Sequence, residues 1–202
     1  MNIGIDIDDT IADTVDAMIK YADKYDVEVL GKKGTNGNMG LIQNRYYLKV
    51  LYGWTDEQKL DFFKKYYKNV LQECKIKLGV KETIQKLKRE GHQIIFITAR
   101  LDYIPNCNTE EITKAFLEEN GIVYDALIVN AKEKLQVSKE KQIDLLIEDS
   151  YDTCKEFLEN NIPTILMTTR MNSQIKDDTV TRVDSWKEIY ETIKRIQNVK
   201  LV

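Results

Sequence analysis

The sequence predicts an α/β protein: a three-layer, Rossmann-like parallel sheet with a small helical cap inserted after the first strand. Over residues 80–202, short apolar runs alternate with amphipathic helical segments, which is typical of parallel strands joined by helices on both faces of a sheet. An opening strand within residues 3–7 is separated from this alternation by a mostly helical stretch. We therefore assign residues 1–12 and 80–202 to the core and residues 13–79 to the cap.

The first strand is short and apolar. Ile3, Ile5 and Ile7 surround Gly4, and the acidic residues begin where the run should leave the interior. Apolar residues then recur at helical spacing over residues 11–25, which predicts an amphipathic helix.

The rest of the cap begins with a glycine-rich loop. Residues 31–40 hold glycines at positions 31, 34, 37 and 40, and such a loop either closes over a site or is an ordinary surface loop. Residues 44–51 and 55–71 are helical in pattern, with Thr55 as a plausible N-cap. Tyrosines are frequent in this block, and aromatic residues at helical spacing are typical of a core as well as of a stacking surface.

The second half contains four more strands and five more helices. We expect strands over residues 94–98, 126–129, 145–147 and 164–167, and helices over residues 80–90, 109–120, 132–140, 150–160 and 186–196.

Composition excludes several classes of protein. The chain has 202 residues, of which 43% are hydrophobic and 31% charged, so it is expected to fold as a globular protein. A formal net charge of −3 argues against a general DNA, RNA or membrane-surface binder. No apolar run approaches the roughly 20 residues of a membrane span. The oligomeric state is not predictable from these features.

The cysteine content indicates a reducing compartment, and the histidine content argues against a zinc site. Cys74, Cys107 and Cys154 have no C-x-x-C spacing, so we expect free thiols in the cytoplasm. The N-terminus shows no signal peptide pattern. A single histidine, His92, makes histidine-based zinc chemistry improbable.

Two aspartates stand at the end of the first strand. Asp6 and Asp8 follow one another with a single residue between them, and crowded carboxylates need a cation or a shared proton. The simpler interpretation of Asp8-Asp9-Thr10 is a turn followed by a helix cap.

Further polar residues follow later strands and favour the first interpretation. Thr98, Ala99 and Arg100 follow one strand, and Glu148 and Asp149 follow another. The carboxyl ends of parallel strands meet at one edge of a sheet, where ligands bind. We therefore expect these residues to converge on one crevice.

The acids in that crevice suit Mg²⁺. Magnesium prefers oxygen ligands, and neither Cys nor His belongs to the set. Side-chain oxygens of Asp6 and Asp149, with a main-chain carbonyl near Asp8, would form the shell. Glu148 would act directly or through water.

These motifs resemble those of the haloacid dehalogenase-like (HAD) phosphatase superfamily. Its Asp-x-Asp-x-Thr motif matches residues 6–10, its strand ending in Thr or Ser matches Thr98, and its acidic pair matches Glu148 and Asp149. The helical insertion after the first strand and the chain length are most similar to the 5′-nucleotidase and 5′(3′)-deoxyribonucleotidase-like group. The Glu at position 148 departs from the commoner Asp.

The resemblance implies roles for several residues. Asp6 would be the nucleophile that forms an aspartyl phosphate, and Asp8 the acid and base. Thr98 would bind a phosphate oxygen. A lysine would neutralise the developing charge, and we favour Lys134. Lys132 and Lys114 are the alternatives.

Substrate contacts are less well defined by the sequence. Ala99 offers a backbone N–H, and Arg100 either contacts substrate or pairs with an acid. In the similar nucleotidases, cap aromatics stack on the base, which makes Tyr46 and Trp54 the leading candidates; two others are Tyr47 and Tyr66.

The predicted function is a Mg²⁺-dependent phosphomonoesterase acting on a small phosphorylated substrate, with a nucleoside monophosphate as the leading choice. Another phosphorylated metabolite is the alternative. Phosphonate or halide chemistry on the same scaffold is a further possibility. A non-catalytic phosphate-binding or phospho-receiver domain would use the same acids without turnover.

Overall fold

The computed structural model describes residues 1–35 and 47–199. Its elements in chain order are β1 (Asn2–Ile5), α1 (Thr14–Glu28), α2 (Tyr47–Tyr52), α3 (Asp56–Glu73), α4 (Val80–Arg89), β2 (Gln93–Ile97), α5 (Thr109–Glu119), β3 (Ala126–Ile128), α6 (Lys134–Glu140), β4 (Leu145–Glu148), α7 (Tyr151–Glu159), β5 (Thr164–Met167), β6 (Thr181–Val183) and α8 (Trp186–Val199).

The strands form one parallel sheet of six strands in the order β3-β2-β1-β4-β5-β6. The order reverses at β1, so β2 and β4 flank it, and this is where open α/β sheets bind ligands. The α/β parallel-sheet prediction is thus confirmed. The sequence missed β6, whose short Thr-Arg-Val segment carries no apolar run.

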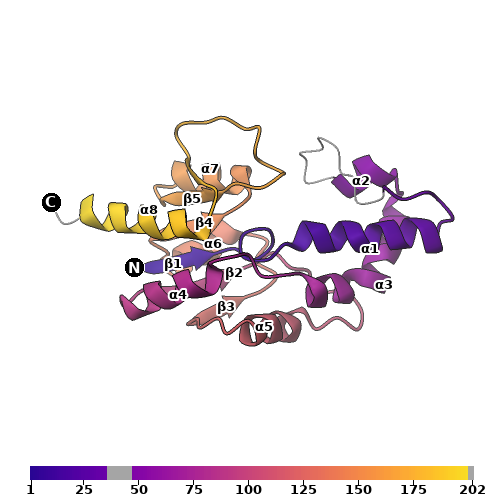
Figure 1. Ribbon diagram of the computed structural model, residues 1–202, viewed down its shortest axis with the longest axis horizontal. Helices are drawn as coiled ribbons and strands as arrows, with labels where there is room; N and C mark the ends of the chain where they lie inside the picture. Colours follow the sequence, from indigo (N-terminus) through magenta and orange to yellow (C-terminus); the bar gives the residue numbers. More distant parts are fainter. Residues whose placement is uncertain (36–46, 200–202) are drawn as a thin grey trace.

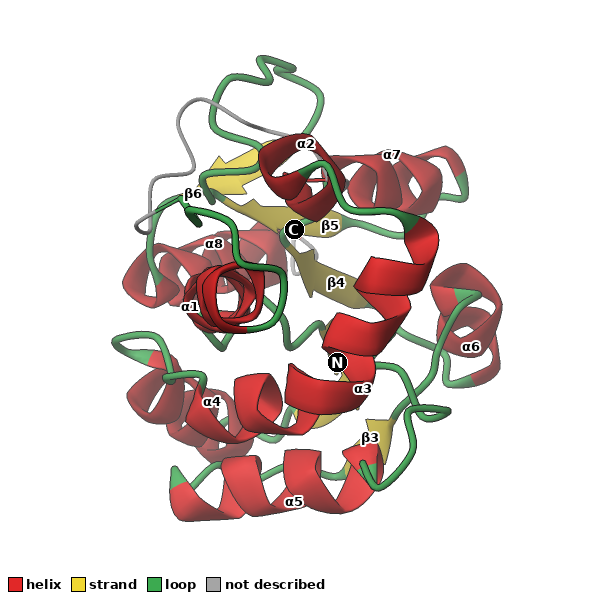
Figure 2. Ribbon diagram, turned by 90° about the vertical axis from the view of Figure 1, so that its right-hand side faces the viewer, coloured by secondary structure: helices red, strands yellow, loops and turns green. Residues whose placement is uncertain are grey.

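Helices cover both faces of the sheet (Figures 1 and 2). Helices α4, α5 and α8 lie on one face, and α6 and α7 on the other. The side chains of Ile3 and Ile5 belong to the core of the first face. At Gly4, an added Cβ would point to the second face of the sheet and lie 3.1 Å from Ile143 Cγ2. Close packing therefore disfavours a side chain at this position, because Ile143 and Leu146 would have to shift to admit it.

The predicted helix over residues 11–25 is wrong at its start, because α1 begins at Thr14. Residues 7–12 instead make a tight turn: Ile11 N and Ala12 N both donate to Ile7 O at 3.0 Å. Asp9 adopts a φ of 58° in this turn, which Asp tolerates better than most residues. The interpretation of Asp9 as a turn residue agrees with this geometry.

Helices α1, α2 and α3 lie beyond the carboxyl edge of the sheet, on the right of Figure 1. Helix α3 begins with a capping box, in which Thr55 accepts from Gln58 N and the Gln58 side chain accepts from Thr55 N. The predicted N-cap at Thr55 is thereby confirmed. The predicted helix over 44–51 and the glycine-rich loop fall partly outside the described residues, and Tyr46 falls wholly outside them.

The segments that enter and leave these helices pair with each other. Asp13 N donates to Lys75 O and Lys77 N donates to Ile11 O, each at 2.8 Å. Ala12 and Ile76 form an antiparallel bridge between these bonds. Lys77 Nζ also lies 2.7 Å from Asp13 Oδ1. The two places where the chain passes between the sheet and helices α1, α2 and α3 therefore lie side by side.

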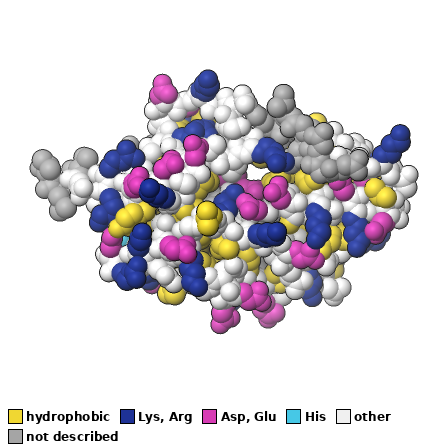
Figure 3. Space-filling model, viewed as in Figure 1, with side chains coloured by type: hydrophobic (Ala, Val, Ile, Leu, Met, Phe, Trp, Pro, Cys, Tyr) yellow, Lys and Arg dark blue, Asp and Glu magenta, His cyan; other side chains and the backbone are white. Residues whose placement is uncertain are grey.

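The three cysteines of the chain lie in described parts of the structure. Cys74, Cys107 and Cys154 are free and buried, as expected for thiols that form no disulfide. No helix in the described part of the chain is both long and apolar enough to cross a membrane. Acidic and basic side chains are interspersed over the face drawn in Figure 3.

Candidate active site

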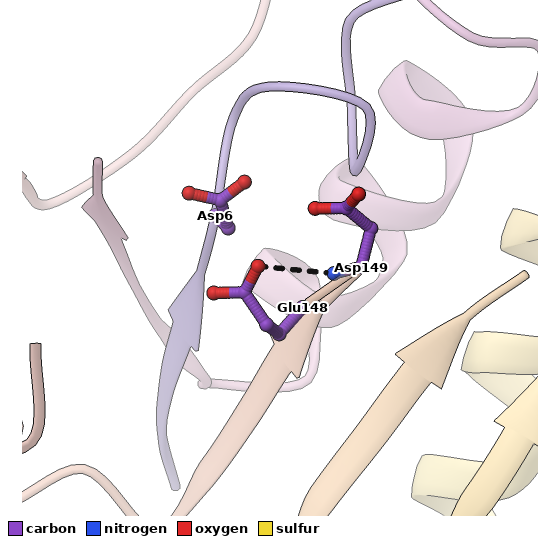
Figure 4. A group of neighbouring side chains, drawn as sticks. All are labelled: Asp6, Glu148 and Asp149. Atoms are coloured by element: carbon purple, nitrogen blue, oxygen red, sulfur yellow. Dashed lines mark hydrogen bonds between the residues drawn. The ribbon is translucent and has the colours of Figure 1, made fainter. Parts of the chain in front are cut away.

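Three carboxylates meet where β1 and β4 end (Figure 4). Asp6 follows β1, Glu148 is the last residue of β4, and Asp149 comes next. One oxygen from each lies within 4.8 Å of the others, close enough to share a metal ion. Because the two strands are neighbours in register, Ile5 opposite Ile147, their ends bring these side chains together.

Lys134, the first residue of α6, also enters this group. Its Nζ lies 2.5 Å from Asp6 Oδ1 and 2.7 Å from Glu148 Oε2. One ammonium against three carboxylates leaves an excess of about two negative charges in a largely buried site. Such a site favours a bound divalent cation.

The pKa values of the carboxyl groups reflect this excess charge. Burial, followed by repulsion from Glu148, raises the pKa of Asp6 to about 7 even though Lys134 opposes the shift. Burial and the Glu148 charge also raise the pKa of Asp149 well above its ordinary value. A cation bound between Asp6 and Asp149 would remove this penalty.

The ligand set fits magnesium. All the available donors are oxygen atoms, the type that Mg²⁺ prefers. Glu148 is less free than the other two acids: Oε1 accepts from Asp149 N and Ser150 N, both at 3.1 Å, while Oε2 accepts from Lys134. Asp6 and Asp149 are therefore the better direct ligands, with Glu148 holding Lys134 in place.

Asp8 faces away from this group, toward Arg100. Arg100 Nη2 and Nε donate to Asp8 Oδ1 at 2.9 and 3.0 Å, and Thr14 Oγ1 donates to the same oxygen at 2.7 Å. Burial alone would raise the pKa of Asp8, but the guanidinium outweighs it, so the pKa lies below its ordinary value. The Asp8 side chain therefore lies outside the acidic cluster, which agrees with a metal shell in which Asp8 contributes through its main chain.

Arg100 is buried, with 2% of its surface exposed. Besides Asp8, its guanidinium donates to Thr113 Oγ1 at 3.0 Å and approaches Cys74 Sγ. Of the two predicted alternatives for Arg100, pairing with an acid is the one that the structure contains.

Thr98 lies at the end of β2 and is fully buried. Its hydroxyl accepts from Arg100 N at 3.2 Å and lies 3.5 Å from Asp8 Oδ2. The next residue, Ala99, is exposed to the cleft together with Asp6 and Lys134. Asp6, Ala99 and Asp149, which follow β1, β2 and β4, line one crevice, whereas the predicted Thr98 is not part of its lining.

The competing lysines are elsewhere. Lys114 Nζ pairs with Glu110 on the exposed side of α5. Lys132 is exposed, and its Nζ lies 5.8 Å from the centre of the Tyr103 ring. Among the three candidates, Lys134 is the one that contacts Asp6.

A cleft of about 650 Å³ opens over the acidic cluster. Its walls include Tyr47 from α2 and Tyr67 from α3, together with Val15 and Met18 from α1. A hollow of about 700 Å³ between α3 and α5 is larger, but its lining includes none of the acids of the cluster. Size alone therefore does not identify the site.

Trp54, a predicted stacking residue, does not line this cleft. It is 3% exposed, its ring stacks at 4.6 Å on Tyr52, and its Nε1 donates to Asp26 at 2.8 Å. Tyr66 lies in the same aromatic cluster, 5.6 Å from Tyr21. Packing among α1, α2 and α3 accounts for both side chains, so the geometry does not support a stacking role for them.

Sequence reasoning missed several residues of the cleft. Tyr67 accepts a hydrogen bond from Leu101 N at 3.0 Å and so joins α3 to the loop after β2. Asn172 lines the cleft from the segment after β5. Tyr67 belongs to a tyrosine-rich block that gave a general signal, whereas no feature of the sequence distinguished Asn172.

Known proteins share this fold. A predicted phosphatase from Clostridium acetobutylicum aligns with a TM-score of 0.70 at 17% identity, covering 96% of this chain and 98% of that chain. CbbY from Rhodobacter sphaeroides, solved in complex with phosphate, aligns with a TM-score of 0.60 at 14% identity, covering 93% and 95%. These likenesses show that the chain has the α/β fold of HAD-superfamily hydrolase structures.

The sequence comparison is more specific. A nucleotidase from Clostridium acetobutylicum is 28% identical over 200 residues, which covers 97% of this chain and 95% of the relative. Residues 1–199 match the family described as 5′ nucleotidase, deoxy (pyrimidine), cytosolic type C, and the chain belongs to that family. It is a nucleotidase-like phosphoric monoester hydrolase.

Proposed function

We propose that this protein is a Mg²⁺-dependent phosphomonoesterase that acts on nucleoside monophosphates through an aspartyl phosphate at Asp6. The observation that carries the proposal is the buried group of Asp6, Glu148, Asp149 and Lys134. This group combines a carboxylate nucleophile, oxygen ligands for a cation, and a lysine that would neutralise negative charge on the phosphoryl group. Bound Mg²⁺ would neutralise phosphate charge and orient the phosphoryl group.

In the first half of the reaction, an Asp6 carboxylate oxygen attacks phosphorus and the ester P–O bond breaks. The leaving oxygen takes a proton from Asp8. Lys134 stabilises the charge that develops on the phosphoryl oxygens. The backbone N–H of Ala99, which borders the cleft, would bind the same oxygens. The buried Thr98 hydroxyl lies 3.5 Å from Asp8 Oδ2 and would act on Asp8.

In the second half, Asp8 takes a proton from a water molecule, which attacks phosphorus. The bond between phosphorus and Asp6 breaks and inorganic phosphate leaves. The contact with Arg100 favours the ionised Asp8 that this step requires. The Arg100 contact therefore supports the proposed role of Asp8 as the base in this step.

The nucleotide substrate is supported by the family and by the lining of the cleft. The family description and the Clostridium relative both name a nucleotidase. Tyr47 and Tyr67 border the cleft, and Tyr47, the less buried of the two, is the candidate for stacking on a base. Another phosphorylated metabolite with a planar or apolar leaving group is the second candidate.

Phosphate release from a panel of nucleoside and sugar monophosphates, with and without Mg²⁺, tests the proposal. We expect Asp6→Asn to lower turnover by about a thousandfold or more, because it removes the nucleophile. Asp152→Asn is the matched control, since Asp152 borders the same cleft but is exposed and outside the cluster. Unchanged turnover in Asp6→Asn, or a long-lived phospho-Asp6 without net hydrolysis, would contradict it.

A further inference from the structure

The segment between β5 and β6, residues 168–180, forms part of the cleft wall opposite the helical segment. It is the orange loop that rises above β5 in Figure 1. Met171 and Ile175 from this segment line the cleft together with Val15 and Met18 of α1. Arg170 Nη2 lies 4.0 Å from Asp16 Oδ1, so the segment reaches α1 across the opening.

Asn172 ties this segment to the acidic cluster. It is 2% exposed, and its Nδ2 donates to Asp149 O at 2.7 Å and to Met167 O at 2.8 Å. Its Oδ1 accepts from Thr169 N at 3.1 Å. A single side chain therefore joins the end of β5, the cleft wall and the backbone of a candidate metal ligand.

Arg182 of β6 completes the support. Its Nη1 donates to Asn172 Oδ1 at 2.6 Å, and its Nη2 donates to Ile175 O at 2.9 Å. The far end of the segment is held by Asp177, which accepts from Tyr151 Oη at 2.7 Å and pairs with Lys155. These contacts fix the wall before any ligand arrives.

The position of residues 168–180 decides which part of the substrate they can contact. Displacement at phosphorus is in line, so the leaving group departs on the side away from Asp6. Besides the tyrosines of α2 and α3, the apolar side chains of α1 and of residues 168–180 are parts of the lining that can accept an uncharged ring.

We propose that Met171 and Ile175 determine specificity by contacting the leaving group of the substrate, and that Asn172 is the residue that positions them relative to the acidic cluster. This inference rests on the proposed phosphomonoesterase function. It assigns a second specificity surface to the sheet side of the cleft, facing α1. Substrates with an apolar or aromatic leaving group gain from this surface, whereas small polar leaving groups do not.

The test compares two phosphate esters, phenyl phosphate and glycerol 3-phosphate, with Met171→Ala and Ile175→Ala. We expect each variant to raise KM for phenyl phosphate by about fivefold to tenfold, because apolar contact with the ring is lost. KM for glycerol 3-phosphate should change by less than about twofold. Gln174→Ala is the control, since Gln174 is exposed in the same segment and outside the cleft lining.

Equal changes for both esters, or none, in a folded and active variant would overturn the inference while leaving the phosphomonoesterase proposal intact. A wild-type protein that hydrolyses no monoester would overturn both.

The role of Asn172 has its own test. Asn172→Ala and the milder Arg182→Lys should both reduce the preference for phenyl phosphate over glycerol 3-phosphate, the first more than the second. Far-UV circular dichroism checks that each variant is folded. If Asn172→Ala does not fold, Arg182→Lys decides, because it keeps a cation at the site. An unchanged preference in a folded variant would show that Asn172 does not position the wall.

Discussion

Lys134 balances charge at the acidic cluster, where Asp6 and Glu148 both contact its Nζ. We expect Lys134→Met to lower the free energy of unfolding by about 3–5 kcal/mol without metal, because two buried carboxylates lose their counter-ion. Mg²⁺ should restore part of the loss. Urea unfolding in EDTA and in Mg²⁺ measures both effects.

The control for that variant is Lys139→Met on the same helix, where Lys139 bonds only the side chain of Asn160 at the surface. If the two variants lose equal stability, Lys134 does not hold the cluster together.

Arg100 offers a second prediction at a single position. Arg100→Lys keeps the charge but loses the paired hydrogen bonds to Asp8, so Asp8 loses its orientation. We expect kcat to fall by about tenfold or more and KM to change little. Steady-state kinetics separates the two parameters. A rise in KM with unchanged kcat would show instead that Arg100 binds substrate.

The sequence predicted the location of those site residues that lie at the ends of strands. Asp6, Thr98 and Glu148 lie where short apolar runs end, and a parallel sheet gathers such ends at one edge. Trp54 and Tyr67 belong to the same aromatic block, yet Trp54 is packed among α1, α2 and α3 whereas Tyr67 borders the cleft. Which side a helix turns toward the sheet depends on tertiary packing, which local spacing does not specify.

Strand β1 depends on the absence of a side chain at Gly4. We expect Gly4→Ala to cost about 1–3 kcal/mol of stability, because its Cβ would meet Ile143 Cγ2 at 3.1 Å and Leu146 Cδ1 at 3.3 Å. Thermal or urea unfolding measures the loss. Combining Gly4→Ala with Ile143→Ala removes the nearer contact.

The double variant should therefore cost less than the sum of the two single changes. Additive losses would mean that β1 tolerates the methyl group by another route.

The sequence prediction was wrong for elements whose hydrophobic pattern is weak or ambiguous: it missed β6 and began α1 too early. Strand β6 is short and its first residue, Thr181, is exposed, so no apolar alternation marks it. Helix α1 was expected to begin at Ile11, but Ile11 and Ala12 are buried in the turn that follows β1. Their apolar character matched a helix face, although it serves the packing of that turn.

The whole molecule should respond to pH through its buried acids. Burial is the main cause that raises the pKa of both Asp6 and Asp9 to about 7, from an ordinary value of 3.8. Between these values the folded protein holds protons that the unfolded chain has lost, so stability falls as pH rises. We expect the Tm of the metal-free protein to decrease from about pH 5 to about pH 7.5.

Saturating Mg²⁺ should weaken this decrease, because the ion stabilises the ionised carboxylates. Thermal unfolding in EDTA and in Mg²⁺ at several pH values provides the measurement. A metal-free Tm that rises over this pH range would contradict the assignment.

Residues 11–13 and 75–77 are the two places where the chain passes between the sheet and the helical stretch of α1, α2 and α3. Since the two segments are hydrogen-bonded neighbours, the ends of the intervening helical stretch lie next to each other. A short connector across this gap could replace the stretch without moving β1 or α4. We therefore expect such a connector to keep the sheet with its acidic cluster and to remove the part of the cleft wall that α1, α2 and α3 supply.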